Sequence, residues 1–272
     1  MDKEVVVITG ASSGIGKASA IYLADKGFKV YALARRLDKL KELLPYGVDI
    51  IVCDVTDKYS RMAAIDTIYQ REGRIDVLYN NAGYGLFGPI EDISESDAKA
   101  QFEVNLFGLA EMTKLVLPIM RKQKRGKIIN TSSIGGRVVS LLGGWYHASK
   151  FAVEGFSDAL RLEVKQFGIK VVLIEPGLIQ TEFMGITYDN SQKLPQETAY
   201  KDLFDKVKSD AKRDYLDKKI GSDPVVVAKA VYKAIKKKNP KTRYVMGKLG
   251  KLAVISKRFL PDKLMDYILL HR

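Results

Sequence analysis

The sequence has few of the residues on which disulfide-rich, metal-binding or membrane-spanning proteins depend. A single cysteine, Cys53, excludes an internal disulfide, and the two histidines, His147 and His271, form no cluster with metal-site spacing. No apolar run approaches the roughly 18 residues that a membrane-spanning helix needs. The first apolar run, from Val5 to Ile8, is too short for a secretory signal. These absences predict a cytoplasmic protein without a metal.

The composition is that of an ordinary globular protein. Of 272 residues, 46% are hydrophobic and 28% are charged, which excludes disorder, collagen and a coiled coil as the main architecture. No linker separates a second unit, so we expect a single domain over residues 1–272. Within it, the weakly periodic segment 182–222 suggests a substrate lid, and residues 247–272 form a basic extension.

The positive charge is concentrated in the last quarter of the chain. The net charge is +13, and residues 201–272 carry 20 basic against 8 acidic side chains. Such a field suits nucleic acid, an anionic membrane or an acidic ligand, and it is equally compatible with a solvated face. Because no nucleic-acid motif accompanies the charge, we do not expect nucleic acid. From residue 248 onwards, apolar and basic residues alternate at helical spacing, which predicts either peripheral contact with an anionic membrane or a cover over a pocket.

Short apolar segments alternate with longer amphipathic ones over the first 180 residues. The predicted strands are Glu4–Thr9, Phe28–Ala34, Asp49–Cys53, Ile75–Asn80, Gly126–Thr131 and Ile169–Glu175, with a last one at Thr242–Met246. The predicted helices are Ile15–Lys26, Tyr59–Arg71, Ser96–Lys122, Tyr146–Phe167 and Tyr200–Lys219, then one from Asp223 to about Lys238, Lys248–Phe259 and Pro261–Leu270. Strands alternating with helices predict an α/β fold: a doubly wound Rossmann-type parallel sheet of about seven strands with helices on both faces.

A glycine-rich turn joins the first predicted strand to the first predicted helix. Gly10, Gly14 and Gly16 follow the spacing Gly-x-x-x-Gly-x-Gly, with Ser12, Ser13 and Ile15 between them. Glycines allow the backbone to turn sharply and approach a pyrophosphate, and the free amides of a helix N-terminus bind anions. A structural turn without a ligand is the alternative.

The second predicted strand ends at Ala34, and Arg35 and Arg36 follow. An acidic residue here would bind the ribose 2′-hydroxyl of NAD, whereas a guanidinium binds a phosphate in bidentate fashion. The pair therefore favours NADP (NADPH), against the alternative of two surface arginines.

Polar residues also follow the third and fourth strands. Asp54, with Val55, lies where adenine would bind, and a helix-capping role is equally open. Asn80 and Asn81, followed by Ala82 and Gly83, either lock neighbouring strands or touch the cofactor.

Ser133, Tyr146 and Lys150 form the candidate reaction centre. Tyr146 and Lys150 are four residues apart on a predicted helix and share a face. An ammonium group beside a phenol is expected to lower its pKa from about 10. Such a tyrosine exchanges a proton with an alcohol or carbonyl oxygen. Ser133, at the end of the fifth strand, offers a hydroxyl to the same oxygen. We expect a structural or surface role for His147.

In this order of motifs the sequence resembles the short-chain dehydrogenase/reductase family over roughly residues 3–250. The resemblance also rests on Asn105 and on the segment Pro176–Thr181. It implies a catalytic set of Asn105, Ser133, Tyr146 and Lys150. In that set Tyr146 is the general acid/base, Lys150 binds the nicotinamide ribose, and Asn105 holds a water that links Lys150 to solvent. Together, the motifs and the resemblance assign cofactor contacts to Gly10, Ser12, Ser13, Gly14, Ile15, Gly16, Arg35, Arg36, Asp54, Val55, Asn81, Ala82, Gly83, Tyr146, Lys150, Pro176, Gly177, Ile179 and Thr181.

The substrate is less well defined by the sequence. The candidate lining is apolar: Leu86, Leu141, Leu142, Trp145, Met184, Ile186 and Tyr188, with Tyr84 and Phe87 as further candidates. The extension after the last strand is similar to that of hydroxysteroid or retinol dehydrogenase-like members. We therefore expect a carbonyl reductase or alcohol dehydrogenase for a lipophilic ketone or aldehyde, and the resemblance suggests a homodimer or homotetramer. The alternatives are an enzyme for small hydroxy acids or 3-oxoacyl thioesters and a non-catalytic NADP-binding sensor.

Overall fold

A computed structural model describes residues 3–183, 185, 187, 198–213, 220–247 and 250–271. Its centre is one parallel sheet with the strand order β3-β2-β1-β4-β5-β6-β7. The strands are β1 (Val5–Thr9), β2 (Lys29–Ala34), β3 (Asp49–Val52), β4 (Val77–Asn80), β5 (Gly126–Thr131), β6 (Ile169–Pro176) and β7 (Arg243–Met246). The predicted Rossmann-type sheet is confirmed, and the strand order reverses between β1 and β4, where such sheets bind ligands.

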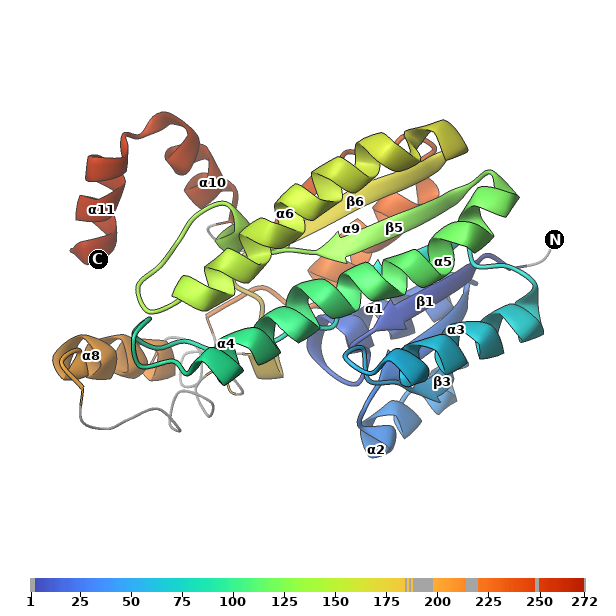
Figure 1. Ribbon diagram of the computed structural model, residues 1–272, viewed down its shortest axis with the longest axis horizontal. Helices are drawn as coiled ribbons and strands as arrows, with labels where there is room; N and C mark the ends of the chain where they lie inside the picture. The colour runs from blue at the N-terminus through green and yellow to red at the C-terminus, as the bar shows by residue number, and fades with distance from the viewer. Residues whose placement is uncertain are drawn as a thin grey trace.

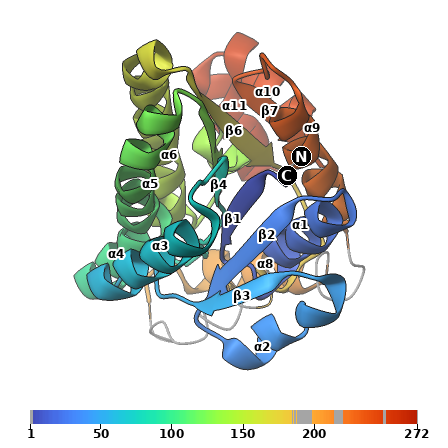
Figure 2. The same ribbon diagram turned by 90° about the vertical axis from the view of Figure 1, so that its right-hand side faces the viewer.

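Helices cover both faces of the sheet (Figures 1 and 2). The longer helices are α1 (Gly14–Asp25), α3 (Lys58–Glu72), α4 (Glu95–Phe102), α5 (Leu109–Gln123), α6 (Gly144–Val164) and α9 (Val225–Lys236). Helices α3, α5 and α6 pack on one face, and α1 and α9 pack on the other. Side chains alternate along each strand, so that Val5 and Val7 face the first group while Val6 and Ile8 face the second. Because helices pack on both faces of the sheet, the carboxyl ends of its strands are held in fixed positions.

Several local features differ from the predicted ones. The segment predicted as one helix over 96–122 is divided into α4, a π-helical turn η2 (Glu103–Gly108) and α5. The short helix α2 (Leu37–Lys41) and the 3-10 turns η1 (Leu44–Tyr46), η3 (Ile134–Gly136) and η4 (Lys165–Phe167) were not predicted. The helix predicted from Asp223 begins at Val225 with Pro224 as its N-cap, and Asp223 Oδ1 accepts a hydrogen bond from the Val225 amide.

Three of the helices beyond β6 lie at the end of the sheet where the strands terminate. Here α8 (Lys201–Ala211) and the pair α10 (Gly250–Phe259) and α11 (Asp262–Leu270) project away from the sheet (Figure 1). Within the segment 182–222, predicted as a substrate lid, residues 182, 183, 185 and 187 are described and are helical, with the Thr187 hydroxyl donating to the Phe183 carbonyl. Among the described residues, no helix is both long enough and apolar enough to span a bilayer.

Candidate active site

A large cleft opens at the carboxyl ends of the strands. Its volume is about 1910 Å³, and it is lined by the loops after β1, β2, β3, β4, β5 and β6 together with α6, α8, α10 and α11. Pockets for small ligands typically measure about 300–1,000 Å³. The cleft therefore has room for two molecules side by side.

The glycine turn after β1 forms the floor of one end of the cleft. Gly10 has a φ of +65°, and a Cβ added there would lie 2.6 Å from Ala82 Cα, so only glycine fits. Ser13 is the N-cap of α1 but makes no capping hydrogen bond, and the first turn holds no acidic residue. The amides at this end of α1 are therefore available to an anion. Gly16 does not line the cleft; a Cβ there would lie 2.4 Å from the Gly10 carbonyl oxygen, and its role is packing.

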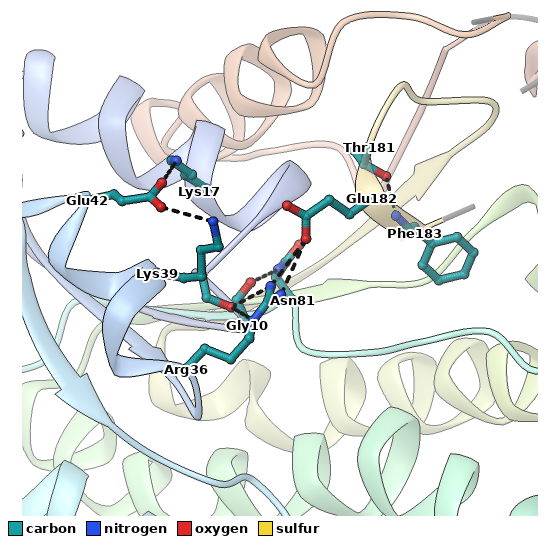
Figure 3. A network of polar contacts seen from close by, with 10 residues as sticks. Gly10, Lys17, Arg36, Lys39, Glu42, Asn81, Thr181, Glu182 and Phe183 are labelled. Carbon is teal, nitrogen blue, oxygen red and sulfur yellow. Dashed lines mark hydrogen bonds and ion pairs between the residues drawn. The ribbon is translucent and has the colours of Figure 1, made fainter. Parts of the chain in front are cut away.

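Arg35 and Arg36 lie at the same end of the cleft but differ in their contacts. The Arg36 guanidinium donates to Ser12 Oγ, with donor–acceptor distances of 3.2 and 3.4 Å, and pairs with Glu182 (Figure 3). The Arg35 side chain is 73% exposed and lies 3.8 Å from Asp54. Arg36 is thus the arginine fixed over the glycine turn.

The residues after β3 and β4 complete this end of the cleft. Asp54 Oδ1 accepts hydrogen bonds from the amide and the hydroxyl of Thr56, while Asp57 caps α3. The helix-capping alternative for Asp54 is therefore wrong. Asn81 Nδ2 donates to the carbonyls of Thr9 and Gly10, which locks β4 to the glycine turn, and Asn81, Ala82 and Gly83 all line the cleft.

Tyr146 lies in the cleft beside two phenylalanine rings. The centroid of Phe87 is 5.4 Å from that of Tyr146, and the centroid of Phe183 is 5.8 Å away. Burial raises the pKa of Tyr146 to about 12, and the hydrogen bond with Ser133 opposes this rise. The expectation that Lys150 lowers this pKa is wrong in this structure, because the ammonium lies 6.0 Å from the Tyr146 ring centroid and desolvation is the larger effect.

Lys150 lies one helical turn further along α6. Its Nζ donates to the Thr131 carbonyl over 3.0 Å. Burial lowers the pKa of Lys150 to about 8, while the nearby Glu154 carboxylate raises it. An ammonium group at this position faces the cleft beside Gly83, since a Cβ on Gly83 would lie 3.4 Å from Nζ.

Asn105 lies behind the cleft wall, in the π-helical turn η2. Its Oδ1 accepts from the Tyr84 amide, and its Nδ2 donates to the Tyr84 carbonyl and to Ser149 Oγ. A Cβ on Gly83 would lie 3.0 Å from Asn105 Oδ1, so Asn105 borders the same small space as Lys150. π-Helical turns are frequent at functional sites, because they displace one side chain from its helical position.

Ser133 follows β5, and its hydroxyl accepts from the Gly135 amide.

The buried His147 supports the wall of the cleft near Ser133. Its Nε2 accepts from the Ser140 amide, so its Nδ1 donates to the Gly135 carbonyl, and burial lowers its pKa. His147 is therefore a neutral structural residue, in agreement with the sequence-based expectation.

The segment after β6 forms the opposite wall of the cleft. The Gly177 amide donates to the Met246 carbonyl, and Ile179 pairs with Ser222 in an isolated bridge. These contacts hold Pro176, Gly177, Ile179 and Thr181 on the cleft lining.

The predicted substrate residues are only partly brought together. Leu86, Leu141, Tyr84 and Phe87 line the cleft. Leu142 and Trp145 do not; they pack with Ile93, Ala98 and Phe204, and Trp145 lines a separate hollow beside α4. Met184, Ile186 and Tyr188 lie outside the described residues.

Sequence reasoning missed Phe183, Glu182 and the α11 residues Met265, Ile268 and Leu269, of which all but Glu182 line the cleft. The i, i+3, i+4 spacing of the three α11 residues was the available signal. Of the apolar residues predicted to cover the pocket, Leu252 lines the cleft, Ile255 and Phe259 are exposed, and Leu249 lies outside the described residues.

Comparison with known proteins identifies the family to which this architecture belongs. The family model described as short chain dehydrogenase matches residues 4–192. The chain belongs to the short-chain dehydrogenase family. This membership makes the protein an oxidoreductase with the Rossmann fold, and the family binds a nicotinamide cofactor.

Similarity to individual members of the short-chain dehydrogenase family extends over nearly the whole chain. The chain is 41% identical to a 3-ketodihydrosphingosine reductase of Bacteroides thetaiotaomicron over 270 residues, which cover 99% of this chain and 97% of the relative. It is 34% identical to an NADPH-dependent 3-dehydrocapnine reductase of Ornithobacterium rhinotracheale, covering 96% of this chain and 94% of the relative. A solved short-chain dehydrogenase of Streptomyces avermitilis superimposes with a TM-score of 0.82 at 30% identity, covering 98% of this chain and 95% of the other.

The residues present fit a dinucleotide. Uncapped helix amides at Ser13, a turn in which only glycine fits at position 10, and the Arg36 guanidinium lie along one end of the cleft. The first two suit a pyrophosphate and the third suits a further phosphate.

Proposed function

We propose that the protein is an NADP(H)-dependent carbonyl reductase, acting in reverse as an alcohol dehydrogenase, on a lipophilic long-chain ketone or aldehyde. The observation that carries the proposal is the presence of Ser133, Tyr146 and Lys150 on the wall of the cleft that also holds the glycine turn and Arg36. The bound cofactor supplies the hydride for the reduction.

The side chains manage the proton in this proposal. A pKa of about 12 keeps the Tyr146 phenol protonated in neutral solution, so it can give its proton to the carbonyl oxygen as that oxygen gains charge. Ser133 donates a hydrogen bond to the same oxygen. Lys150, at the cleft surface beside Gly83, holds the nicotinamide ribose, and Asn105 positions a water that connects Lys150 to solvent.

The lining of the cleft supports a lipophilic substrate. Around Tyr146 it is formed by Leu86, Phe87, Leu141 and Phe183, with α10 and α11 adding further apolar side chains. The two bacterial relatives are named as reductases of 3-ketodihydrosphingosine and 3-dehydrocapnine, and both names place the reacting carbonyl at carbon 3. Helix α8 adds the charged side chains of Lys206 and Asp210 to the lining, which suits the polar head of an amphiphile.

A series of 3-ketones with one head group and increasing chain length tests this function, with NADPH oxidation as the readout. Each buried CH2 contributes about 0.8 kcal/mol, so kcat/KM should rise about fourfold per methylene until the cleft is filled. A short polar ketone or a 3-oxoacyl thioester outperforming the long chains would overturn the lipophilic assignment. Stoichiometric NADPH binding without turnover of any carbonyl would instead support a sensor.

We further propose that α10 and α11 contact an anionic membrane. Their exposed apolar side chains are Leu252, Ile255, Phe259, Leu264, Tyr267, Ile268 and Leu270, and basic residues at 251, 257, 258 and 263 accompany them. Each basic residue near an anionic surface contributes about 1 kcal/mol. Flotation with vesicles of neutral and anionic lipid should recover the protein on the anionic vesicles at low salt. The double substitution Ile255→Ser/Phe259→Ser should reduce recovery, and no binding by the unaltered protein would refute the contact.

A homodimer or homotetramer is the oligomeric state that we propose from the family resemblance. Half-exposed Phe107 in η2 and Phe151 on α6, with the exposed Leu162, offer an apolar surface for a second copy. Light scattering coupled to size-exclusion chromatography measures the mass, and a monomer at micromolar concentration would refute the proposal.

A further inference from the structure

An ion pair crosses the cleft above the glycine turn. Arg36 follows β2, and Glu182 follows β6, on the other side of β1 in the sheet. Glu182 Oε2 accepts from both terminal nitrogens of Arg36, over 3.4 and 3.5 Å (Figure 3). The pair therefore connects the two halves of the sheet directly over the turn that faces the cofactor.

Glu182 reaches Arg36 from an anchored backbone. Thr181 packs against Gly14, since a Cβ on Gly14 would lie 3.1 Å from Thr181 Cβ. The Phe183 amide donates to Thr181 Oγ1, and the Phe183 ring packs against Tyr146. The carboxylate is thus held near Arg36 by contacts on both sides of its own residue.

The Glu182 carboxylate occupies the two terminal nitrogens of Arg36, which a phosphate would need for a bidentate contact. Ser12 Oγ accepts from Nε and one terminal nitrogen, and Glu182 accepts from both terminal nitrogens. A guanidinium binds a phosphate best with two parallel donors. A phosphate that binds Arg36 is repelled by the negatively charged Glu182 carboxylate. It must displace this carboxylate from the terminal nitrogens to form the bidentate contact.

We propose that Glu182 is a specificity-determining residue, which competes with the 2′-phosphate of NADP(H) for Arg36 and so limits the preference for NADP(H) over NAD(H). This inference rests on the proposed NADP(H) dependence. Glu182 weakens the binding of NADP(H) and leaves that of NAD(H) nearly unaffected. Only NADP(H) carries the 2′-phosphate that needs the two terminal nitrogens of Arg36. Binding of NADP(H) therefore breaks the ion pair between Arg36 and Glu182, which connects the two halves of the sheet.

Calorimetric titration of the Glu182→Gln variant tests the proposal without turnover. The probes are NADP+, NAD+ and adenosine 2′,5′-bisphosphate, which carries the 2′-phosphate without the nicotinamide. The variant frees both terminal nitrogens of Arg36 and removes a like charge beside the phosphate, so we expect Kd for NADP+ and for the bisphosphate to fall about three- to tenfold. Kd for NAD+ should change less than about twofold.

Two further variants make the result specific. Glu95→Gln removes an equal charge from an exposed pair with Lys99 on α4 and should leave all three affinities unchanged. In an Arg36→Ala background, Glu182→Gln should have no effect, because the competition needs the guanidinium.

Tighter binding of NADP+ in the single variant alone supports the proposal. Unchanged or weaker NADP+ binding in Glu182→Gln would overturn it, as would an equal gain for NAD+. Equal affinity of the unaltered protein for NADP+ and NAD+ would instead refute the proposed cofactor preference.

Discussion

The two arginines after β2 are expected to contribute unequally to cofactor affinity. Arg36 is fixed over the glycine turn by Ser12 and Glu182, whereas Arg35 is 73% exposed and its Asp54 contact is 3.8 Å long. A charge-assisted hydrogen bond to a phosphate contributes roughly 1.5–3 kcal/mol. Arg36→Ala should therefore raise Kd for NADPH about 10- to 150-fold. Arg35 acts only as an exposed charge, so Arg35→Ala should cost less than about 1 kcal/mol, or about fivefold.

Titration of NADPH and NADH at one fixed salt concentration measures both effects, because exposed charges are screened by salt. Affinity for NADH should change less than about twofold in each variant, since NADH carries no 2′-phosphate. The reasoning is refuted if Arg36→Ala weakens NADPH and NADH equally, or if Arg35→Ala is the more damaging substitution.

Two further substitutions test how the fold supports the site. Gly16→Ala should lower both the melting temperature and the NADPH affinity. The added Cβ would lie 2.4 Å from the Gly10 carbonyl oxygen and 2.6 Å from Asn81 Nδ2. Unchanged thermal unfolding would contradict this prediction. Burial raises the pKa of Glu175 to about 7 and Glu154 adds to the rise, while the paired Arg137 and Arg243 oppose it. The folded state then holds a proton that the unfolded state loses near its ordinary pKa, so stability should fall as the pH rises from about 4.5 to about 7. Glu175→Gln should remove much of this fall in urea unfolding, and an undiminished slope would count against it.

The sequence identified the sheet and the groups at its edge because parallel strands carry their own signal. Each buried strand is a continuous apolar run, and the carboxyl ends of parallel strands meet at one edge. Tyr146, Ser133 and Lys150 could therefore be placed together without a structure. The short helix α2 was missed because five residues show no periodicity.

Side-chain direction and long-range contacts could not be predicted from spacing. Leu142 has a φ of +62° and packs away from the cleft, and Trp145, next to Tyr146 on the helix, packs on a neighbouring cluster. The pKa of Tyr146 depends on its burial, to which Phe87 and Phe183 contribute from distant segments. The contact between Arg36 and Glu182 joins residues 146 positions apart, and no local pattern indicates it.

The central claim is that Tyr146 transfers the proton, and a matched pair of tyrosine substitutions tests it most directly. Tyr146→Phe keeps the ring that packs against Phe87 and Phe183 but removes the hydroxyl. Tyr79→Phe removes another buried hydroxyl, which accepts from the Thr131 hydroxyl, and Tyr79 itself does not line the cleft. General acid–base catalysis contributes about 10²- to 10⁴-fold to a rate. In Tyr146→Phe, kcat for NADPH-dependent carbonyl reduction should therefore fall by that factor, with NADPH affinity nearly unchanged. In Tyr79→Phe, kcat should fall by less than about twofold. A Tyr146→Phe enzyme that kept more than half of the original rate would contradict the account.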